Sequence, residues 1–164
     1  MSILLENGKK LGFGLMRLPK AGDHSDVEEV KVMVDKFLEA GFTYFDTAWA
    51  YGDSEDTIRQ ALVERYPRDS YTLATKCAAW IGCKTREDAM AQFETSLKRT
   101  GAGYFDYYLL HNLGEHRTAF FEDFDLWTWG MELKEKGLAK AAKKAGRIAA
   151  MGLVKTAVSE DETK

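Results

Sequence analysis

The chain has 164 residues, which is long enough for one domain with a sizeable hydrophobic core. Its composition, 45% hydrophobic and 30% charged, is typical of a soluble globular protein, and its formal net charge of −3 gives no reason to expect nucleic acid or an anionic membrane as a partner. The apolar runs are shorter than a transmembrane helix, and the N-terminus lacks the features of a signal peptide. The two cysteines, Cys77 and Cys83, are too few for a disulfide framework or a closed zinc site, so we expect a cytoplasmic protein.

The first part of the chain predicts a hairpin followed by a core strand. Residues 2–10 contain Asn7-Gly8, which is a strong signal for a two-residue hairpin turn. Residues 11–18 form an apolar run that Pro19 ends, so we expect the first strand of the core there. The two glycines in this run would allow the close approach of a neighbouring strand or of a ligand.

Four amphipathic helices are predicted from apolar residues that recur at helical spacing. The first begins at Ser25 and Glu28, which have the spacing of a capping box. We expect the four helices at about residues 25–40, 54–66, 85–100 and 120–136. Their C-terminal ends are marked by Gly41, Pro67, Gly101 and Gly137, which are residue types that commonly end a helix.

Three further strands are predicted between these helices. They are short runs rich in aromatic and β-branched residues, at 42–46, 71–76 and 104–111. Together with the strand at 11–18, they give four strand–helix units in strict alternation. This alternation predicts an α/β fold with a parallel sheet and right-handed crossovers.

The sequence changes character after residue 137. Residues 138–150 are rich in Ala, Lys and Gly, and predict a weakly amphipathic helix and no strand. The short apolar stretch at 151–154 is compatible with a strand or with a continued helix, and 159–164 with a frayed tail. We therefore expect two parts: residues 1–137, which hold the strand–helix units, and residues 138–164, a divergent Ala/Lys-rich helical segment and tail.

Polar, titratable residues stand where three of the predicted strands end. These are Asp46, Lys76 and His111, and Tyr51 follows Asp46 by five residues. Neighbouring parallel strands lie about 5 Å apart with their carboxyl ends at one edge, so we expect the four side chains to converge. A lysine beside a tyrosine lowers the pKa of the phenol, and an aspartate paired with that lysine holds it in place. Such a group suits proton donation to a carbonyl oxygen while another group supplies hydride.

The motifs around these residues resemble the aldo-keto reductases, which are (β/α)8-barrel enzymes that use NADPH. The motifs are Asp46-Thr-Ala-x-x-Tyr51-Gly52 followed by Glu55, then Thr75-Lys76, then Leu109-Leu110-His111. Residues 12–19 and 104–112 look most like bacterial members that carry a ferredoxin-type region at the C-terminus. The resemblance covers roughly residues 9–137. The cysteines of the ferredoxin-type region are absent, so no iron–sulfur cluster is expected.

The resemblance implies a role for each of the four residues. Tyr51 would be the general acid, Lys76 would tune its pKa, Asp46 would pair with Lys76, and His111 would orient the carbonyl. Met16 and Arg17, together with Asp46, would approach the nicotinamide ribose of NADPH. The implied substrate is a small-molecule aldehyde or ketone.

The resemblance also implies an incomplete fold, namely half of a (β/α)8 barrel with the N-terminal hairpin at one end. A complete barrel needs at least about 200 residues, and four strand–helix units are recognised here. The family's other cofactor-binding residues follow strands five to eight and are not recognised in 138–164. We therefore expect a truncated chain whose edge strands, at 11–18 and 104–111, are unpaired, and this favours a homodimer.

Two functions of different classes follow from these observations. The first is NADPH-dependent reduction of aldehydes or ketones to alcohols. The alternative is a catalytically silent half-barrel fragment that acts as a structural or self-associating module. A metal site made of Asp46, Glu55 and His111 is a third hypothesis, but the ligand spacing does not support it, so no metal is expected.

Overall fold

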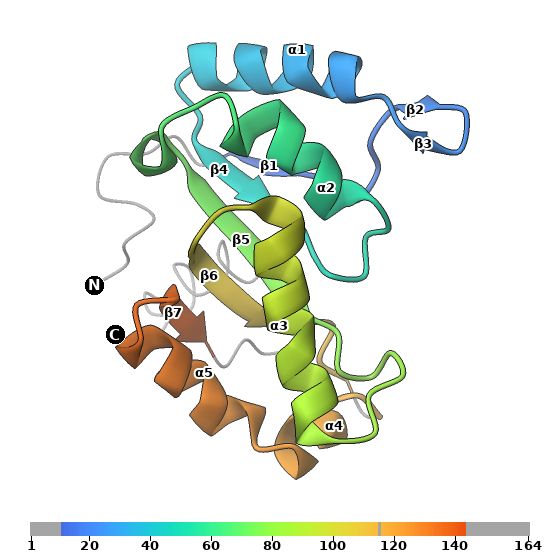
Figure 1. Cartoon of the computed structure of the whole chain (residues 1–164), viewed down its shortest axis with the longest axis vertical. Coiled ribbons are helices and arrows are strands. Elements are labelled where there is room, and N and C mark those ends of the chain that lie inside the picture. Colours follow the sequence, from blue (N-terminus) through green and yellow to red (C-terminus); the bar gives the residue numbers. More distant parts are fainter. Residues whose placement is uncertain (1–10, 115, 144–164) are drawn as a thin grey trace, which may run out of the picture.

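A parallel five-stranded sheet forms the centre of the protein in a computed structural model, which describes residues 11–114 and 116–143 (Figure 1). The strands lie in the order β1-β4-β5-β6-β7, and each is parallel to its neighbour. They are β1 (Gly12–Gly14), β4 (Tyr44–Asp46), β5 (Thr72–Cys77), β6 (Phe105–Leu110) and β7 (Ala139–Lys143). The predicted hairpin at 2–10 lies outside the described residues.

The helices follow the strands in chain order and lie along the sheet (Figure 1). The α-helices are α1 (Val27–Glu39), α2 (Ser54–Ile58), α3 (Arg86–Thr100), α4 (Thr118–Asp123) and α5 (Leu126–Glu135). A π-helix, η1 (Arg59–Val63), continues α2, so that the helix predicted at 54–66 is α-helical only in its first part, and a short 3-10 helix, η2 (Arg68–Ser70), precedes β5. A small antiparallel hairpin, β2 (Lys20–Ala21) with β3 (His24–Ser25), precedes α1. In the part of the chain that the structure describes, every helix is too short or too polar to cross a membrane. The predicted alternation of strands and helices, and with it the α/β class, is confirmed.

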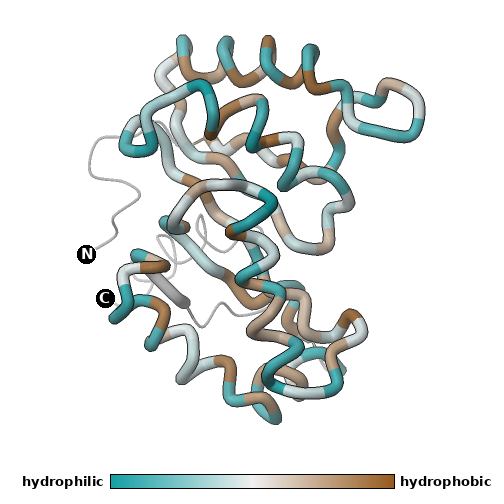
Figure 2. The backbone as a smooth tube through the Cα atoms, in the orientation of Figure 1, coloured by the Kyte–Doolittle hydropathy of each residue, from teal (hydrophilic) through white to brown (hydrophobic). Residues whose placement is uncertain are grey.

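The main hydrophobic core lies between the sheet and the helices. Side chains from the strands, such as Phe45 and Leu73, pack there with Val34 of α1, Phe93 of α3 and Trp129 of α5. Apolar and polar residues alternate along these helices, as expected when only one face is packed (Figure 2). A second, smaller cluster of Ala74, Tyr107 and Leu109 is distinct from this core. Successive residues of β5 therefore face opposite sides of the sheet: Leu73 faces the main core, and Ala74 faces the smaller cluster.

The helix predicted to begin at Thr85 is confirmed in detail. The Thr85 hydroxyl accepts a hydrogen bond from the backbone N–H of Asp88 at 3.2 Å, and the Asp88 carboxylate accepts one from the backbone N–H of Thr85 at 3.0 Å. At the other end, Gly101 has a φ of 64° and stops the helix in the left-handed conformation. Capping signals of this kind act over a few residues, so they can be recognised without the tertiary structure.

The capping box predicted at Ser25 is wrong by one residue. The cap of α1 is Asp26, whose carboxylate accepts a hydrogen bond from the N–H of Glu29 at 3.0 Å. Ser25 instead lies in β3, where its N–H and hydroxyl both donate to the carboxylate of Asp53, at 2.6 and 2.8 Å. A contact over 28 residues has replaced the local one.

The first predicted core strand is shorter than expected, and the last predicted helix is interrupted. The strand at 11–18 is reduced to Gly12–Gly14, and the N–H of Leu15 makes the last bond to the neighbouring strand, at 2.9 Å from the carbonyl oxygen of Asp46. The helix at 120–136 is divided into α4 and α5 at Asp125, which has a φ of 47°. Its carboxylate accepts hydrogen bonds from Thr128 and Arg86, which hold the chain in this bent form.

The prediction of a helix and no strand after residue 137 is wrong for residues 139–143. These residues form β7, which pairs with β6 so that Phe105 lies opposite Ala139 and Leu109 opposite Lys143. Alanine and lysine favour helices, but an unpaired edge of a buried strand offers a full set of hydrogen bonds that overrides this preference. Strand β6 is therefore not an edge of the sheet, as had been expected; the edges of the described sheet are β1 and β7. The rest of the predicted segment lies outside the described residues.

Candidate active site

The four predicted side chains come together at the carboxyl ends of three neighbouring strands. Asp46 is the last residue of β4, Lys76 is the last but one of β5, and His111 directly follows β6. Tyr51 lies in the loop between β4 and α2. The parallel register explains this meeting, since it places the polar ends of β4, β5 and β6 at one edge of the sheet.

The ammonium group of Lys76 is the centre of the cluster. It forms an ion pair with the carboxylate of Asp46, donates to the carbonyl oxygen of Thr47 at 2.8 Å, and lies 3.4 Å from the hydroxyl oxygen of Tyr51. The Lys76 side chain is 0% exposed. A buried ammonium needs a counter-charge and hydrogen-bond acceptors, and here it has both.

Burial dominates the electrostatics of the Lys76–Asp46 pair. It lowers the pKa of Lys76, and the charge and hydrogen bond of Asp46 oppose that fall. Burial likewise raises the pKa of Asp46, against the opposing effect of Lys76. The hydroxyl of Tyr44 donates a further, long hydrogen bond to Asp46 at 3.5 Å, a partner that the sequence motifs do not reveal.

The pKa of Tyr51 is shifted in the direction opposite to the one expected. Burial of the phenol raises its pKa, and the negative charge of Asp46 raises it further. The expectation that Lys76 would lower the pKa of Tyr51 is therefore wrong for this structure, because burial and the charge of Asp46 act in the opposite direction. Tyr51 is consequently a protonated phenol at neutral pH, with its oxygen held beside an ammonium group.

His111 closes the other side of the cluster as a neutral imidazole. Its ring lies 5.4 Å from the ring of Tyr51, nearly perpendicular to it at 82°. Burial lowers the pKa of His111 to about 4, and the positive charges of Lys76 and Arg117 add to the effect. Its Nδ1 atom is buried and has no hydrogen-bond partner among the described residues.

Two residues near His111 were not predicted as site residues. Trp80 donates a hydrogen bond from Nε1 to the carbonyl oxygen of His111 at 3.0 Å, and the two rings lie 6.0 Å apart. The guanidinium carbon of Arg117 lies 4.3 Å from the centre of the Trp80 ring. No signal in the sequence marks Arg117, because it follows a loop and approaches the other residues only through the tertiary fold.

Met16 and Arg17 lie just beyond β1 at the same end of the sheet. The N–H of Leu15, which precedes them, donates to the carbonyl oxygen of Asp46, so the chain leaves the sheet beside the cluster. Met16 is 62% exposed, and Arg17 is also exposed. They are placed beside the four residues, and their side chains face solvent rather than Lys76.

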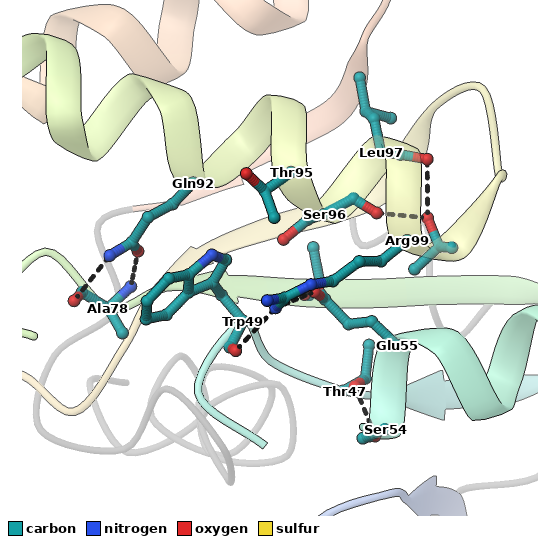
Figure 3. A network of polar contacts seen from close by, with 12 residues as sticks. Thr47, Trp49, Ser54, Glu55, Ala78, Gln92, Thr95, Ser96, Leu97 and Arg99 are labelled. Atoms are coloured by element: carbon teal, nitrogen blue, oxygen red, sulfur yellow. Dashed lines mark hydrogen bonds and ion pairs between the residues drawn. The ribbon is translucent and has the colours of Figure 1, made fainter. Parts of the chain in front are cut away.

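The glutamate of the first motif has a role within the protein. Glu55 accepts a hydrogen bond from the hydroxyl of Thr75 at 2.7 Å, and Arg99 lies 3.5 Å from its other oxygen (Figure 3). The carboxylate of Asp46 is likewise engaged within the protein, since it forms an ion pair with Lys76.

Among the residues that the structure describes, no three His, Cys, Asp or Glu side chains are grouped so that they could hold a metal ion.

Comparison with known protein families gives one broad match. The sequence profile of the aldo/keto reductase family matches residues 10–161. An aldo-keto reductase of Mycolicibacterium smegmatis is 35% identical over 120 residues, which are 73% of this chain and 40% of that protein. One from Mycobacterium sp. (strain MCS) is 32% identical over 145 residues, which are 85% of this chain and 46% of that protein. The chain thus spans less than half the length of these curated relatives.

Solved structures give the same result. An aldo/keto reductase of Brucella melitensis has a TM-score of 0.62 and 26% identity, over 90% of this chain and 54% of that one. An aldo-keto reductase of Klebsiella pneumoniae, solved in complex with NADPH, has a TM-score of 0.59 and 27% identity, over 80% of this chain and 43% of that one.

A short stretch of 32 residues, 20% of this chain, is also 75% identical to elongation factor Ts of Clostridium perfringens, where it covers 11% of the protein.

Proposed function

The chain belongs to the aldo/keto reductase family, and from this premise we propose that it is an oxidoreductase that reduces small aldehydes or ketones to alcohols with NADPH. The observation that carries the proposal is the position of the Lys76 ammonium, which touches Asp46 and Thr47 and lies 3.4 Å from the Tyr51 hydroxyl. This arrangement suits a carbonyl substrate, whose oxygen must receive a proton when the carbon is reduced.

Tyr51 is the proton donor in this proposal. A tyrosine has an ordinary pKa of about 10 and that of Tyr51 is raised, so the phenol is protonated at neutral pH and its O–H is available to donate to a carbonyl oxygen. When the proton leaves, the phenolate is stabilised by the ammonium of Lys76 at its side. Asp46 holds that ammonium in place, and the carbonyl oxygen of Thr47 fixes its direction.

His111 orients the substrate carbonyl. Because its pKa is lowered, the imidazole is neutral at neutral pH, so it can donate a hydrogen bond without placing a second positive charge beside Lys76. Its buried Nδ1 has no partner within residues 11–114 and 116–143, and leaving a lone pair there avoids burying an unpaired N–H. We therefore place the imidazole proton on Nε2, where it would donate to the substrate oxygen.

The residues beside the cluster fit the nicotinamide end of NADPH. Gly14 lies opposite Asp46 in the sheet, and a Cβ atom added to Gly14 would meet no atom of the described residues within 4 Å, so these residues leave room at Gly14. Met16 and Arg17 are exposed next to this space. We propose that these two residues and Asp46 hold that part of the cofactor. The Klebsiella pneumoniae relative, solved in complex with NADPH, supports the choice of NADPH as the cofactor. The bound cofactor would supply hydride.

Titration of the purified chain with NADPH, followed by turnover of a test aldehyde, checks this proposal. We expect saturable binding and aldehyde-dependent oxidation of NADPH in the wild-type chain. Replacing Tyr51→Phe should leave binding unchanged and reduce turnover at least about 100-fold, since a general acid contributes roughly that much. An unchanged rate in this variant would show that Tyr51 is not the acid.

Tyr71→Phe is the matched control. It also removes one tyrosine hydroxyl, but that hydroxyl is buried and has no hydrogen-bond partner among the described residues. Tyr71 directly precedes β5, whereas Lys76 lies near the other end of that strand. Turnover should therefore survive in Tyr71→Phe. Equal losses in the two variants would indicate a general effect of tyrosine replacement rather than catalysis by Tyr51.

A second candidate function is a silent, self-associating module, and the shape of the sheet supports it. Strands β1 and β7 are each paired on one side only among the described residues, and such edges favour pairing with another chain. We propose that two copies of the chain form a homodimer. We also propose a reducing, cytoplasmic setting, which the two free thiols of Cys77 and Cys83 support. Sedimentation velocity checks the dimer; a monomer at all concentrations would contradict it.

A further inference from the structure

Arg99 reaches from the outer helix α3 to the loop that carries Tyr51 (Figure 3). Its Nη1 atom lies 3.4 Å from the carbonyl oxygen of Trp49 and 3.5 Å from the Oε2 atom of Glu55. Its guanidinium carbon lies 5.7 Å from the centre of the Trp49 ring. The one side chain therefore contacts the backbone and the ring of a residue that stands two positions before Tyr51.

The backbone of Trp49 is held from two sides. Its N–H donates to the carbonyl oxygen of Lys76 at 3.2 Å, and its carbonyl oxygen accepts from Arg99. The next step is a tight turn, in which the N–H of Tyr51 donates to the carbonyl oxygen of Ala48 at 3.0 Å. Since so short a turn leaves little freedom, the position of Trp49 determines where the phenol of Tyr51 lies.

Glu55 joins this loop to the strand that carries Lys76. The residue is 1% exposed, one carboxylate oxygen accepts from Thr75, the neighbour of Lys76, and the other faces Arg99. Burial raises the pKa of Glu55, and the hydrogen bond from Thr75 and the charge of Arg99 oppose the rise. A buried carboxylate held by donors from two different elements is a rigid junction rather than a solvated surface group.

We infer that Arg99 and Glu55 are positioning residues, which hold the Tyr51 hydroxyl at the Lys76 ammonium from outside the active site. The chain of contacts runs from Lys76 through Thr75 and Glu55 to Arg99, and from Arg99 through Trp49 to Tyr51. The inference rests on the proposed role of Tyr51. It adds a path of contacts through α3 between the two groups, besides their own contact at 3.4 Å and the backbone hydrogen bond from Trp49 to Lys76.

Arg99→Met tests this inference, because it removes the charge and keeps the apolar stem. Arg86→Met is the control: Arg86 lies on the same helix, is 32% exposed against 33% for Arg99, and pairs with Asp125 and Glu132 far from Tyr51 in sequence. Arg99→Lys restores the charge without the planar fork. All variants are made in the full chain.

The first readout is the titration of Tyr51, followed by NMR of chains labelled with carbon-13 at tyrosine Cζ and assigned with Tyr51→Phe. In Arg99→Met, the pKa of Tyr51 should fall towards 10, since a freed loop moves the phenol away from Asp46 and into water. Arg86→Met should leave it unchanged, and Arg99→Lys should restore part of the shift. An unchanged Tyr51 titration in Arg99→Met overturns the inference.

Amide hydrogen exchange gives the second readout. We expect the Tyr51 amide to exchange about tenfold faster in Arg99→Met, while the amides of Leu73 and Tyr107 in the central strands keep their rates. Equal acceleration at all three amides would mean that Arg99 only stabilises the fold, which overturns the inference. Thr75→Val, which removes the hydroxyl that binds Glu55, is the second variant if Arg99→Met does not fold, and the same outcomes apply to it.

Neither readout needs cofactor or turnover, so the two proposals fail separately. A wild-type chain that does not reduce aldehydes overturns the proposed function, while the titration and exchange of Tyr51 still decide whether Arg99 positions it. An active wild-type chain with unchanged Tyr51 behaviour in Arg99→Met keeps the function and removes the positioning role.

Discussion

Lys76 is the residue on which the candidate site depends. Its side chain is fully buried, yet its charge is shared between a carboxylate, a backbone carbonyl and a phenol. The surrounding residues are therefore required for stability as well as for the proposed chemistry. Two predictions at this scale concern the buried charges of the site.

Replacing Asp46→Ala should destabilise the protein strongly. It leaves the Lys76 ammonium buried without its counter-charge, and breaking a buried ion pair by removing one partner costs about 3 kcal/mol or more in the free energy of unfolding. Urea unfolding measures the change. Adding Lys76→Met should recover much of the loss, because the unpaired charge is then gone; no recovery would mean that Asp46 stabilises the fold independently of Lys76.

The titration of His111 should be displaced far below that of an ordinary histidine. Its pKa is lowered to about 4, from 6.5 in the unfolded chain, so between these values the unfolded chain binds a proton that the folded chain does not. The free energy of unfolding should therefore fall as the pH drops from 6.5 to 4. NMR titration of the imidazole checks the value, and Arg117→Gln should raise it, because one of the two opposing positive charges is lost. A midpoint near 6.5 would contradict the buried, neutral imidazole.

At the scale of elements, β7 depends on a group of charges at the end of the sheet opposite the candidate site. Asp106 of β6 accepts hydrogen bonds from the N–H of Leu73 at 2.9 Å and from Arg68 at 2.8 Å, and Lys140 of β7 lies 2.7 Å from its other oxygen. One buried carboxylate thus ties β5, β6 and β7 together. This contact supports a strand that the composition of residues 139–143 disfavours.

Asp106→Ala should therefore cost about 3 kcal/mol in the free energy of unfolding, since it removes the counter-charge of Arg68 and Lys140 and leaves the buried N–H of Leu73 without its acceptor. Glu64→Ala is the comparison, because the Glu64–Arg59 pair is about half exposed on each side and such pairs contribute less than about 1 kcal/mol. Denaturant unfolding of both variants gives the answer. Equal, small losses would show that Asp106 does not secure β7.

At the scale of the whole molecule, the described sheet is open at both sides. Its edges are β1 and β7, and the chain spans less than half the length of its curated relatives. If two copies pair through these edges, folding is coupled to association, and the thermal midpoint should rise with protein concentration. Calorimetry over a hundredfold range of concentration measures this. A constant midpoint would indicate that the edges are not used for pairing in solution.

The sequence by itself determined the features that local rules govern. The strand ends at Asp46, Lys76 and His111 follow from hydrophobic runs and turn residues, and parallel alternation then brings them to one edge of the sheet. The start of the helix at Thr85 is equally local. Motif order was sufficient to indicate the family, since the four site residues are spaced along the chain as the barrel's strands require.

The tertiary structure alone decided the features that depend on distant partners. Residues 139–143 form a strand because β6 offers them a pairing edge, against their own helix preference. The pKa of Tyr51 rises, although a lysine lies beside it, because burial and Asp46 outweigh that neighbour. Arg99 approaches Trp49 across 50 residues of sequence. Side-chain periodicity encodes which face is buried, but pairing energies and electrostatic fields depend on distances that only the folded chain establishes.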